Sequence, residues 1–163
     1  MKIKYLLVYF SLLFSFSVKA NNNAIEYSEE ELQWADSVLN TLSTRQKIAQ
    51  LIMLAVYSNK SEVYNSETIE LFENLQLGGI IFMQGGPIRQ AMLCNRIQAK
   101  LNIPALIAID AEYGLAMRLD STIYYPRAMA LSAINNTKSI FDMGREIGRQ
   151  CKRMGIHVNF APV

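Results

Sequence analysis

The sequence predicts an α/β protein built around a parallel sheet. Short, continuously apolar runs recur along the chain, and the segments between them place apolar residues at helical spacing. A strand of a parallel sheet reads as apolar throughout because helices cover both faces of such a sheet. In addition, polar residues gather where one of these runs, residues 105–109, ends. At this level a doubly wound sheet and a (β/α)8 barrel look alike, so both architectures stay open.

The first predicted elements are helical. The pair Ser28 and Glu31 fits a capping box, and apolar residues at helical spacing then predict a helix over residues 29–42. A short second helix begins at residue 43 or 44. The run LIMLAVY, residues 51–57, follows. It is either the end of a helix or a buried strand, and periodicity alone does not decide between them.

The rest of the chain alternates helices and strands. Glycine pairs at 78–79 and 85–86 mark the two ends of one strand, and Pro87 suits the first position of a helix. Pro104 opens the next strand, and Gly155 is a suitable stop for the last helix. The predicted helices cover residues 66–75, 87–101 and 137–154, and the predicted strands cover residues 51–57, 79–83, 105–110 and 157–163.

The candidate functional residues follow the third strand. Asp110 ends that strand, and Glu112 and Arg118 come after it, at the edge where α/β folds place ligands and chemistry. The Asp110 carboxylate can bind two sugar hydroxyls, act as a base, hold a cation, or merely cap the next turn. The planar Arg118 guanidinium suits a pair of ligand oxygens or the Asp110 carboxylate itself. Asp110 and Glu112 are too close in sequence to flank a sugar from opposite sides, so neither is assigned as nucleophile or acid.

Other residue types narrow the site further. Tyr113, Tyr124 and Tyr125 form either an aromatic wall for a sugar ring or ordinary packing. His157 is the sole histidine and precedes a strand rather than ending one, which favours a structural role. The sequence has no Cys/His spacing for a metal and no phosphate-binding glycine motif. We therefore expect no metal site and no cofactor.

The N-terminus and the charge balance indicate export. Two lysines precede an uncharged, mostly apolar run over residues 5–18, and Val18-Lys19-Ala20 fits a signal peptidase site. Residues 1–20 are therefore predicted to be a signal peptide, with an uncleaved anchor as the alternative. Without them the chain has 13 basic and 14 acidic residues and no basic run. We expect a periplasmic or extracellular protein with no stable membrane span after cleavage and no nucleic-acid partner.

The two cysteines do not suggest a disulfide scaffold. Cys94 and Cys151 both fall on predicted helices at apolar positions. Two cysteines are too few to define a disulfide framework, and a single bridge stays open in an oxidising compartment. Buried free thiols are the favoured interpretation.

Three segments resemble a known family. LGGIIFMQGG (residues 77–86), IPALIAIDAEYGLAMRLDS (103–121) and MGIHVNFAPV (154–163) resemble the N-terminal domain of glycoside hydrolase family 3. They are most similar to its bacterial β-N-acetylglucosaminidase (β-N-acetylhexosaminidase) branch. The resemblance extends over residues 34–163. It implies a (β/α)8 barrel, retaining hydrolysis through a covalent glycosyl-enzyme, and a β-N-acetylglucosaminide in cell-wall or related glycans as the substrate.

The resemblance also implies roles for two residues. Asp110 corresponds to the strand-end aspartate that binds hydroxyls of the sugar to be released, and Arg118 corresponds to the arginine that helps build that subsite. The family usually has two glycines after the glutamate, where this chain has Tyr113-Gly114. This variant resembles long exported members that carry a β-lactamase-like domain after the glycosidase, and it leaves the finer substrate preference open.

The resemblance places the catalytic groups outside these residues. The family's Lys-His segment, its His general acid and its nucleophilic Asp are expected beyond Val163, and a complete barrel takes about 250 residues. We therefore expect a signal peptide (1–20), a linker with the start of the first helix (21–33) and a truncated barrel domain (34–163) that is inactive alone. The alternatives are a β-glucosidase or β-xylosidase of the same family, or a non-catalytic exported sugar-binding fragment.

Overall fold

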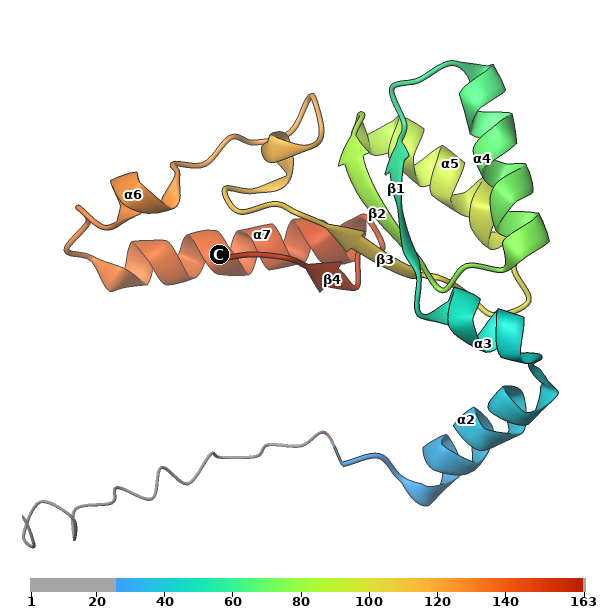
Figure 1. Cartoon of the computed structure of the whole chain (residues 1–163). Helices are drawn as coiled ribbons and strands as arrows, with labels where there is room; N and C mark the ends of the chain where they lie inside the picture. The colour runs from blue at the N-terminus through green and yellow to red at the C-terminus, as the bar shows by residue number, and fades with distance from the viewer. Residues whose placement is uncertain (1–25, 163) are drawn as a thin grey trace, which may run out of the picture. The chain divides into compact units, whose positions relative to one another are not determined.

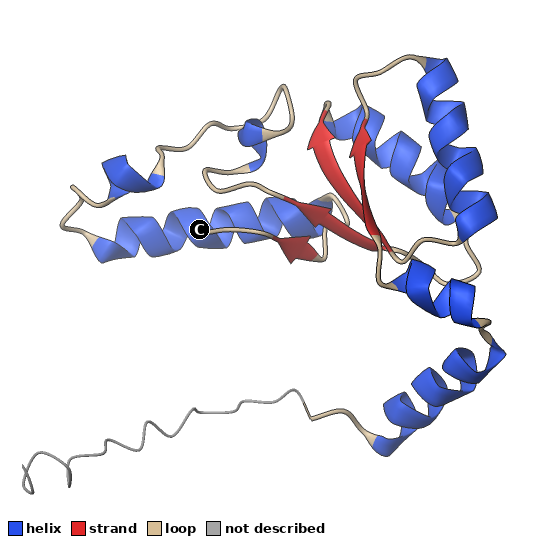
Figure 2. Ribbon diagram, viewed as in Figure 1, coloured by secondary structure: helices blue, strands red, loops and turns tan. Residues whose placement is uncertain are grey.

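The computed structural model of the chain describes residues 26–162 and contains a parallel four-stranded sheet (Figures 1 and 2). The strands are hydrogen-bonded in chain order, and all three pairs are parallel. A helix lies between each strand and the next, which confirms the predicted alternation. The strands are β1 (Met53–Tyr57), β2 (Gly79–Gln84), β3 (Leu106–Ile109) and β4 (Val158–Asn159), and the helices between them are α4 (Glu62–Leu75), α5 (Pro87–Gln98) and α7 (Thr137–Arg153).

The chain divides into a unit up to Val38 and a unit from Leu39 onward. Most of helix α2 (Glu29–Thr41) belongs to the first unit. Its predicted capping box is confirmed, because Glu31 accepts a hydrogen bond from the backbone N–H of Ser28 and the Ser28 hydroxyl accepts one from the N–H of Glu31. Helix α2 buries none of its side chains. The predicted signal peptide, residues 1–20, lies outside the described residues.

A second capping box precedes the first strand. Ser43 caps helix α3 (Thr44–Gln50), where the Gln46 side chain bonds back to the backbone of Ser43. The apolar run that follows is a strand, which settles the open alternative. Leu51 is 87% exposed and belongs to the turn before β1, so the strand begins two residues later than the run itself.

Helix α4 begins earlier than the sequence predicts. Its first residue is Glu62 rather than residue 66, because Ser61 caps it by accepting a hydrogen bond from the N–H of Tyr64. The helix ends at Leu75, as predicted, and is capped by Gln76, which adopts a left-handed conformation with φ 53°. The glycine pair at 78–79 follows this stop and leads into β2, which begins at Gly79.

The core lies between the sheet and helices α4 and α5, which cover one face of it (Figure 1). Successive strand residues point to opposite faces of the sheet. Val56 on β1, Ile80 and Phe82 on β2, and Ile107 and Ile109 on β3 are fully or almost fully buried. The two helices also pair with each other through Arg96–Glu62 and Lys100–Glu73. The buried strand and helix residues of this core are Val56, Phe72, Ile80, Phe82, Leu93, Ile97, Ile107 and Ile109.

The C-terminal part differs from the sequence prediction in two places. The predicted strand over residues 157–163 shrinks to Val158–Asn159, which pair with Ala108 and Ile109. Strand β3 ends at Ile109, whose carbonyl accepts a hydrogen bond from the Phe160 N–H at 2.9 Å, and the backbone pairing stops there. The long connection before α7 is also not structureless, since it contains a 3₁₀ turn, η1 (Leu115–Met117), and a short helix, α6 (Ala128–Leu131).

Candidate functional site

The segment from Asp110 to Asp120 folds back over the carboxyl ends of β2 and β3. Its far end attaches to Gly85, directly after β2, where the Gly85 N–H donates to the Arg118 carbonyl at 3.0 Å and the Asp120 N–H donates to the Gly85 carbonyl at 2.8 Å. Leu115 and Leu119 are buried and anchor the segment from within. Asp110 and Arg118 are eight residues apart in the sequence, and the segment between them forms a compact loop at the strand ends.

Gly85 is required for this attachment because there is no space for a side chain. A Cβ on Gly85 would lie 1.7 Å from the Oγ of Ser58, the residue that follows β1. Ser58 is 4% exposed, and its N–H donates to the carbonyl of Gln84 at 2.8 Å. The Ser58 hydroxyl is buried and has no hydrogen-bond partner among the described residues. The ends of β1 and β2 and the returning segment therefore meet at one tightly packed point.

Asp110 and Arg118, the two predicted site residues, contact each other directly. One terminal nitrogen of Arg118 pairs with Oδ2 of Asp110, and the Arg118 Nε donates to the Asp110 carbonyl at 3.0 Å. The side chains are 26% exposed for Asp110 and 16% exposed for Arg118. Of the two uses considered for the arginine, the structure shows the one in which it grips the strand-end carboxylate.

The second carboxylate oxygen of Asp110 has no partner. Oδ1 is buried and accepts no hydrogen bond from any described residue. A charged acceptor without a donor is costly. The pair therefore leaves one buried carboxylate oxygen unpaired beside a guanidinium, while the Asp110 side chain as a whole is 26% exposed. Carboxylate oxygens are acceptors for hydroxyl groups of a polar ligand.

The three predicted tyrosines divide between surface and core. The rings of Tyr113 and Tyr124 lie 5.1 Å apart, tilted by 46°, and the Arg127 guanidinium carbon lies 5.4 Å from the Tyr113 ring centre. A hydrogen bond with Tyr124 raises the pKa of Arg127. Tyr125 packs against the core instead, and its hydroxyl accepts from Gln150 at 3.3 Å. Packing thus accounts for Tyr125, and the aromatic wall for a sugar ring stays a prediction for Tyr113 and Tyr124.

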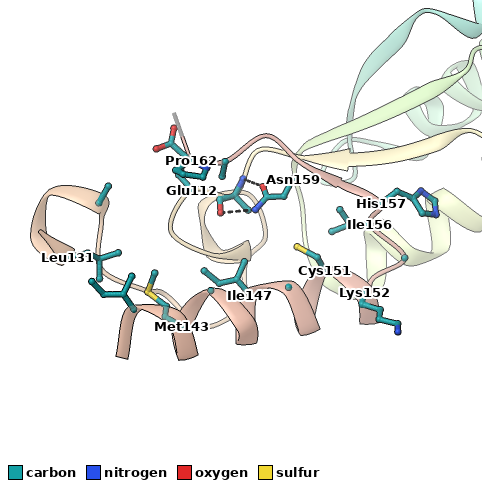
Figure 3. Close-up of a pocket in the computed structure, with 17 residues that line it drawn as sticks. Glu112, Leu131, Met143, Ile147, Cys151, Lys152, Ile156, His157, Asn159 and Pro162 are labelled. Carbon is teal, nitrogen blue, oxygen red and sulfur yellow. Dashed lines mark hydrogen bonds between the residues drawn. The ribbon is translucent and has the colours of Figure 1, made fainter. Parts of the chain in front are cut away.

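Glu112, the other predicted carboxylate, does not join the Asp110–Arg118 pair but lines a groove. This apolar groove of about 780 Å³ runs along helix α7 (Figure 3). Most of the lining is apolar, with Met143, Ile147 and Cys151 on the helix side. Neither Asp110 nor Arg118 lines this groove. We therefore place the polar site at the strand ends and not in the groove.

Metal-ligand types do not cluster in the part of the chain that the structure describes. Residues 26–162 contain no group of three or more His, Cys, Asp or Glu side chains that could hold a metal ion. Cys94 and Cys151 are free, and burial raises the pKa of both thiols. Within the same range no helix is long and apolar enough to cross a membrane.

Sequence reasoning missed one residue beside the site. Asn159 on β4 forms two hydrogen bonds with Ala111, the residue after Asp110 (dashed in Figure 3). A polar residue in an otherwise apolar strand was the available signal. His157, for which a structural role is predicted, accepts a hydrogen bond from the backbone N–H of Ile107 through its Nδ1.

The parallel sheet with its intervening helices, together with the Asp110–Arg118 pair at the strand ends, is typical of an α/β-barrel protein. Residues 43–163 match the family described as "Glycosyl hydrolase family 3 N terminal domain". The chain therefore belongs to glycoside hydrolase family 3, and its four strands are the N-terminal part of a (β/α)8 barrel. The alternative of a doubly wound sheet is excluded.

Two curated relatives share this domain. A "Beta-N-acetylglucosaminidase/beta-glucosidase" of Cellulomonas fimi is 24% identical over 83% of this chain, and "Beta-hexosaminidase LpqI" of Mycobacterium tuberculosis is 28% identical over 75% of it. The matched regions are 23% and 31% of the relatives' own lengths. The chain thus spans about a quarter to a third of these relatives.

Two solved structures are also similar. A glycoside hydrolase family 3 β-N-acetylglucosaminidase from Paenibacillus sp. str. FPU-7 superposes with a TM-score of 0.61 at 30% identity, covering 74% of this chain and 24% of that one. A β-glucoside phosphorylase, BglX, bound to 2FGlc gives a TM-score of 0.74 at 20% identity, covering 83% and 24%. The second likeness concerns the fold alone.

Proposed function

We propose that this chain supplies part of the sugar-binding subsite of a retaining glycosidase that removes β-linked N-acetylglucosamine from cell-wall or related glycans. The observation that carries the proposal is the Asp110–Arg118 pair with its unpaired Oδ1 at the strand ends. Family membership and the names of the relatives support the glycosidase class and the N-acetylglucosaminide. In this role the Asp110 carboxylate accepts hydrogen bonds from sugar hydroxyls, and Arg118 holds that carboxylate in place.

The test is the substitution Asp110→Ala in the complete enzyme. Losing a charged hydrogen bond to the substrate costs about 3 kcal/mol, so kcat/KM for p-nitrophenyl β-N-acetylglucosaminide should fall about a hundredfold. The matched control is Asp120→Ala, because Asp120 lies in the same segment and also pairs with an arginine, Arg89, but at the exposed surface. The control should leave kcat/KM within about twofold. An unchanged kcat/KM in Asp110→Ala removes Asp110 from the site.

The sugar itself is tested in parallel. The Cellulomonas relative is named for both N-acetylglucosaminidase and glucosidase activity, which keeps β-glucosides as the second candidate substrate. The kcat/KM values for the p-nitrophenyl β-N-acetylglucosaminide, β-glucoside and β-xyloside of the complete enzyme rank the three substrates. A higher value for the glucoside or the xyloside contradicts the proposed specificity.

We propose further that the bond-breaking groups lie outside these 163 residues. Retaining hydrolysis needs a nucleophile and an acid/base on opposite sides of the glycosidic bond. The chain matches only about a quarter to a third of its relatives' length, which supports this assignment. The purified chain alone should release no p-nitrophenol. Measurable turnover by contaminant-free material contradicts the assignment and favours a complete active site.

Export is also a proposal, supported by the lysines and the apolar run before residue 20. In a bacterial host the mature protein should begin near Asn21 and fractionate outside the cytoplasm. N-terminal sequencing of the product checks this expectation. A product that retains residues 1–20 supports the anchor alternative instead.

A further inference from the structure

Two side chains, Asn159 on β4 and His157 just before it, add hydrogen bonds to the backbone pairing of β3 and β4. The ladder itself contains only Val158 and Asn159. On its N-terminal side, Nδ1 of His157 accepts from the Ile107 N–H at 2.9 Å, in the place of a backbone carbonyl. On its C-terminal side, Oδ1 of Asn159 accepts from the Ala111 N–H at 3.0 Å, and Nδ2 lies 3.5 Å from the Ala111 carbonyl.

The Asn159 side chain bonds to the backbone of Ala111, the residue that follows Asp110. Asp110 lies between Ile109, whose carbonyl accepts from the Phe160 N–H at 2.9 Å, and Ala111, which Asn159 holds by both of its polar groups. The Asp110 carbonyl is taken by Arg118. The backbone on both sides of Asp110 is therefore tied, and the tie on the downstream side comes from Asn159.

We propose that Asn159 is a positioning residue that sets the direction of the Asp110 carboxylate. It acts through the backbone of Ala111 and does not itself touch the sugar. The reason is geometric: without the amide, the Ala111 N–H loses its acceptor, and the peptide that follows Asp110 is held only by the bond of its carbonyl with Arg118. Arg118 then still holds Oδ2 but no longer fixes where Oδ1 points. This role rests on the proposed function of Asp110 as the sugar ligand.

The chain offers a matched control for this role in His157. Each side chain accepts one backbone N–H. That of Ala111, bonded to Asn159, follows β3 and Asp110, whereas that of Ile107, bonded to His157, lies within β3 on the side away from the site. Asn159→Ala and His157→Ala should therefore lower Tm by similar amounts, because each leaves one backbone donor unpaired. Only Asn159→Ala should impair sugar binding.

The experiment compares both variants in the complete enzyme, well below either Tm. We expect Asn159→Ala to lower kcat/KM for p-nitrophenyl β-N-acetylglucosaminide about tenfold, mainly by raising KM, and His157→Ala to stay within about twofold. Equal losses in the two variants show a general effect of weakened pairing and overturn the proposal. An unchanged kcat/KM in Asn159→Ala overturns it as well.

A readout without sugar separates this inference from the proposed function. The Arg118 Nε–H bond to the Asp110 carbonyl reports the backbone geometry, and its NMR signal can be followed in the chain itself. Asn159→Ala should shift this signal and shorten its exchange lifetime, whereas His157→Ala should not. If Asp110→Ala leaves activity unchanged, the proposed function fails. The NMR signal of Arg118 Nε–H then tests by itself whether Asn159 positions the backbone after Asp110.

A second variant covers the case in which Asn159→Ala does not fold. Asn159→Asp keeps the shape of the side chain and the acceptor for the Ala111 N–H, but loses the donor. It should retain the Arg118 signal at its original position and lose less than half as much activity as the alanine variant, on a logarithmic scale. A loss as large as that of the alanine variant contradicts the role of the accepted hydrogen bond.

Discussion

The tightest point of the structure, Gly85 against Ser58, gives a prediction whose size follows from the geometry. In Gly85→Ala the new methyl group would lie 1.7 Å from the Ser58 Oγ, and if that hydroxyl moved away it would still lie 3.0 Å from the Ser58 Cβ. Overpacking of this kind costs about 1–3 kcal/mol. The free energy of unfolding should therefore fall by about 2 kcal/mol.

The substitution Ser58→Ala changes stability in the opposite direction. It removes a buried hydroxyl that has no partner among the described residues and should stabilise the chain by about 1 kcal/mol. In the double variant the atom that causes the clash is gone, so most of the cost of Gly85→Ala should disappear. The two substitutions should thus be coupled by about 1–2 kcal/mol.

The assay is urea unfolding of the wild type, both single variants and the double variant, followed by circular dichroism. Equal denaturant slopes would show that the four chains unfold between comparable states. In thermal unfolding 1 kcal/mol should appear as a shift of about 3–4 °C. A coupling energy below about 0.5 kcal/mol would refute the reasoning, since the close approach would then not be what makes glycine necessary.

Three further predictions concern other parts of the structure. Gly114→Ala should destabilise the chain by about 1–3 kcal/mol, measured by urea unfolding, because Gly114 has φ +90° and its Cβ would lie 2.5 Å from the ring of Tyr125. Burial raises the pKa of Cys94 and Cys151, so Ellman's reagent should label them slowly in native protein at pH 8 and quickly in urea, and stability should fall as the pH rises through the ordinary thiol value of 9.0. The hydrogen bond from Arg149 lowers the pKa of Glu146 to about 2, so this exposed pair should stabilise helix α7 above pH 4.5 and lose its effect as the pH falls towards 2; Glu146→Gln should flatten the dependence of Tm on pH in that window.

Much of the architecture could be predicted because local signals agree with the fold. Strands β2 and β3 are bounded by glycine or proline, and Pro87 opens α5 as expected. The errors arise where two signals compete. Ser61 and Ser66 both suit a helix start, and only the hydrogen bond that the Tyr64 N–H donates to the Ser61 hydroxyl decides for the first.

The contact between Asp110 and Arg118 could be anticipated from the sequence, but the contacts that support it could not. Asp110 and Arg118 are evident from their place after an apolar strand. That Arg118 grips the carboxylate depends on the return of the segment to Gly85, a contact distant in sequence. The length of β4 and the contacts of Asn159 could not be predicted for the same reason, because both depend on where β3 ends.

The segment from Asp110 to Asp120 is attached at both of its ends, so it and the loop that follows should tolerate insertions and deletions differently. A change in length before Asp120 would disrupt the backbone hydrogen bonds that join this segment to Gly85. From Ser121 to Asn136 the chain runs at or near the surface, apart from Tyr125, and a longer or shorter connection there need not move Asp110 or Arg118. Loop insertion after Asp120 can therefore change the surroundings of Asp110 and Arg118 while this pair keeps its position.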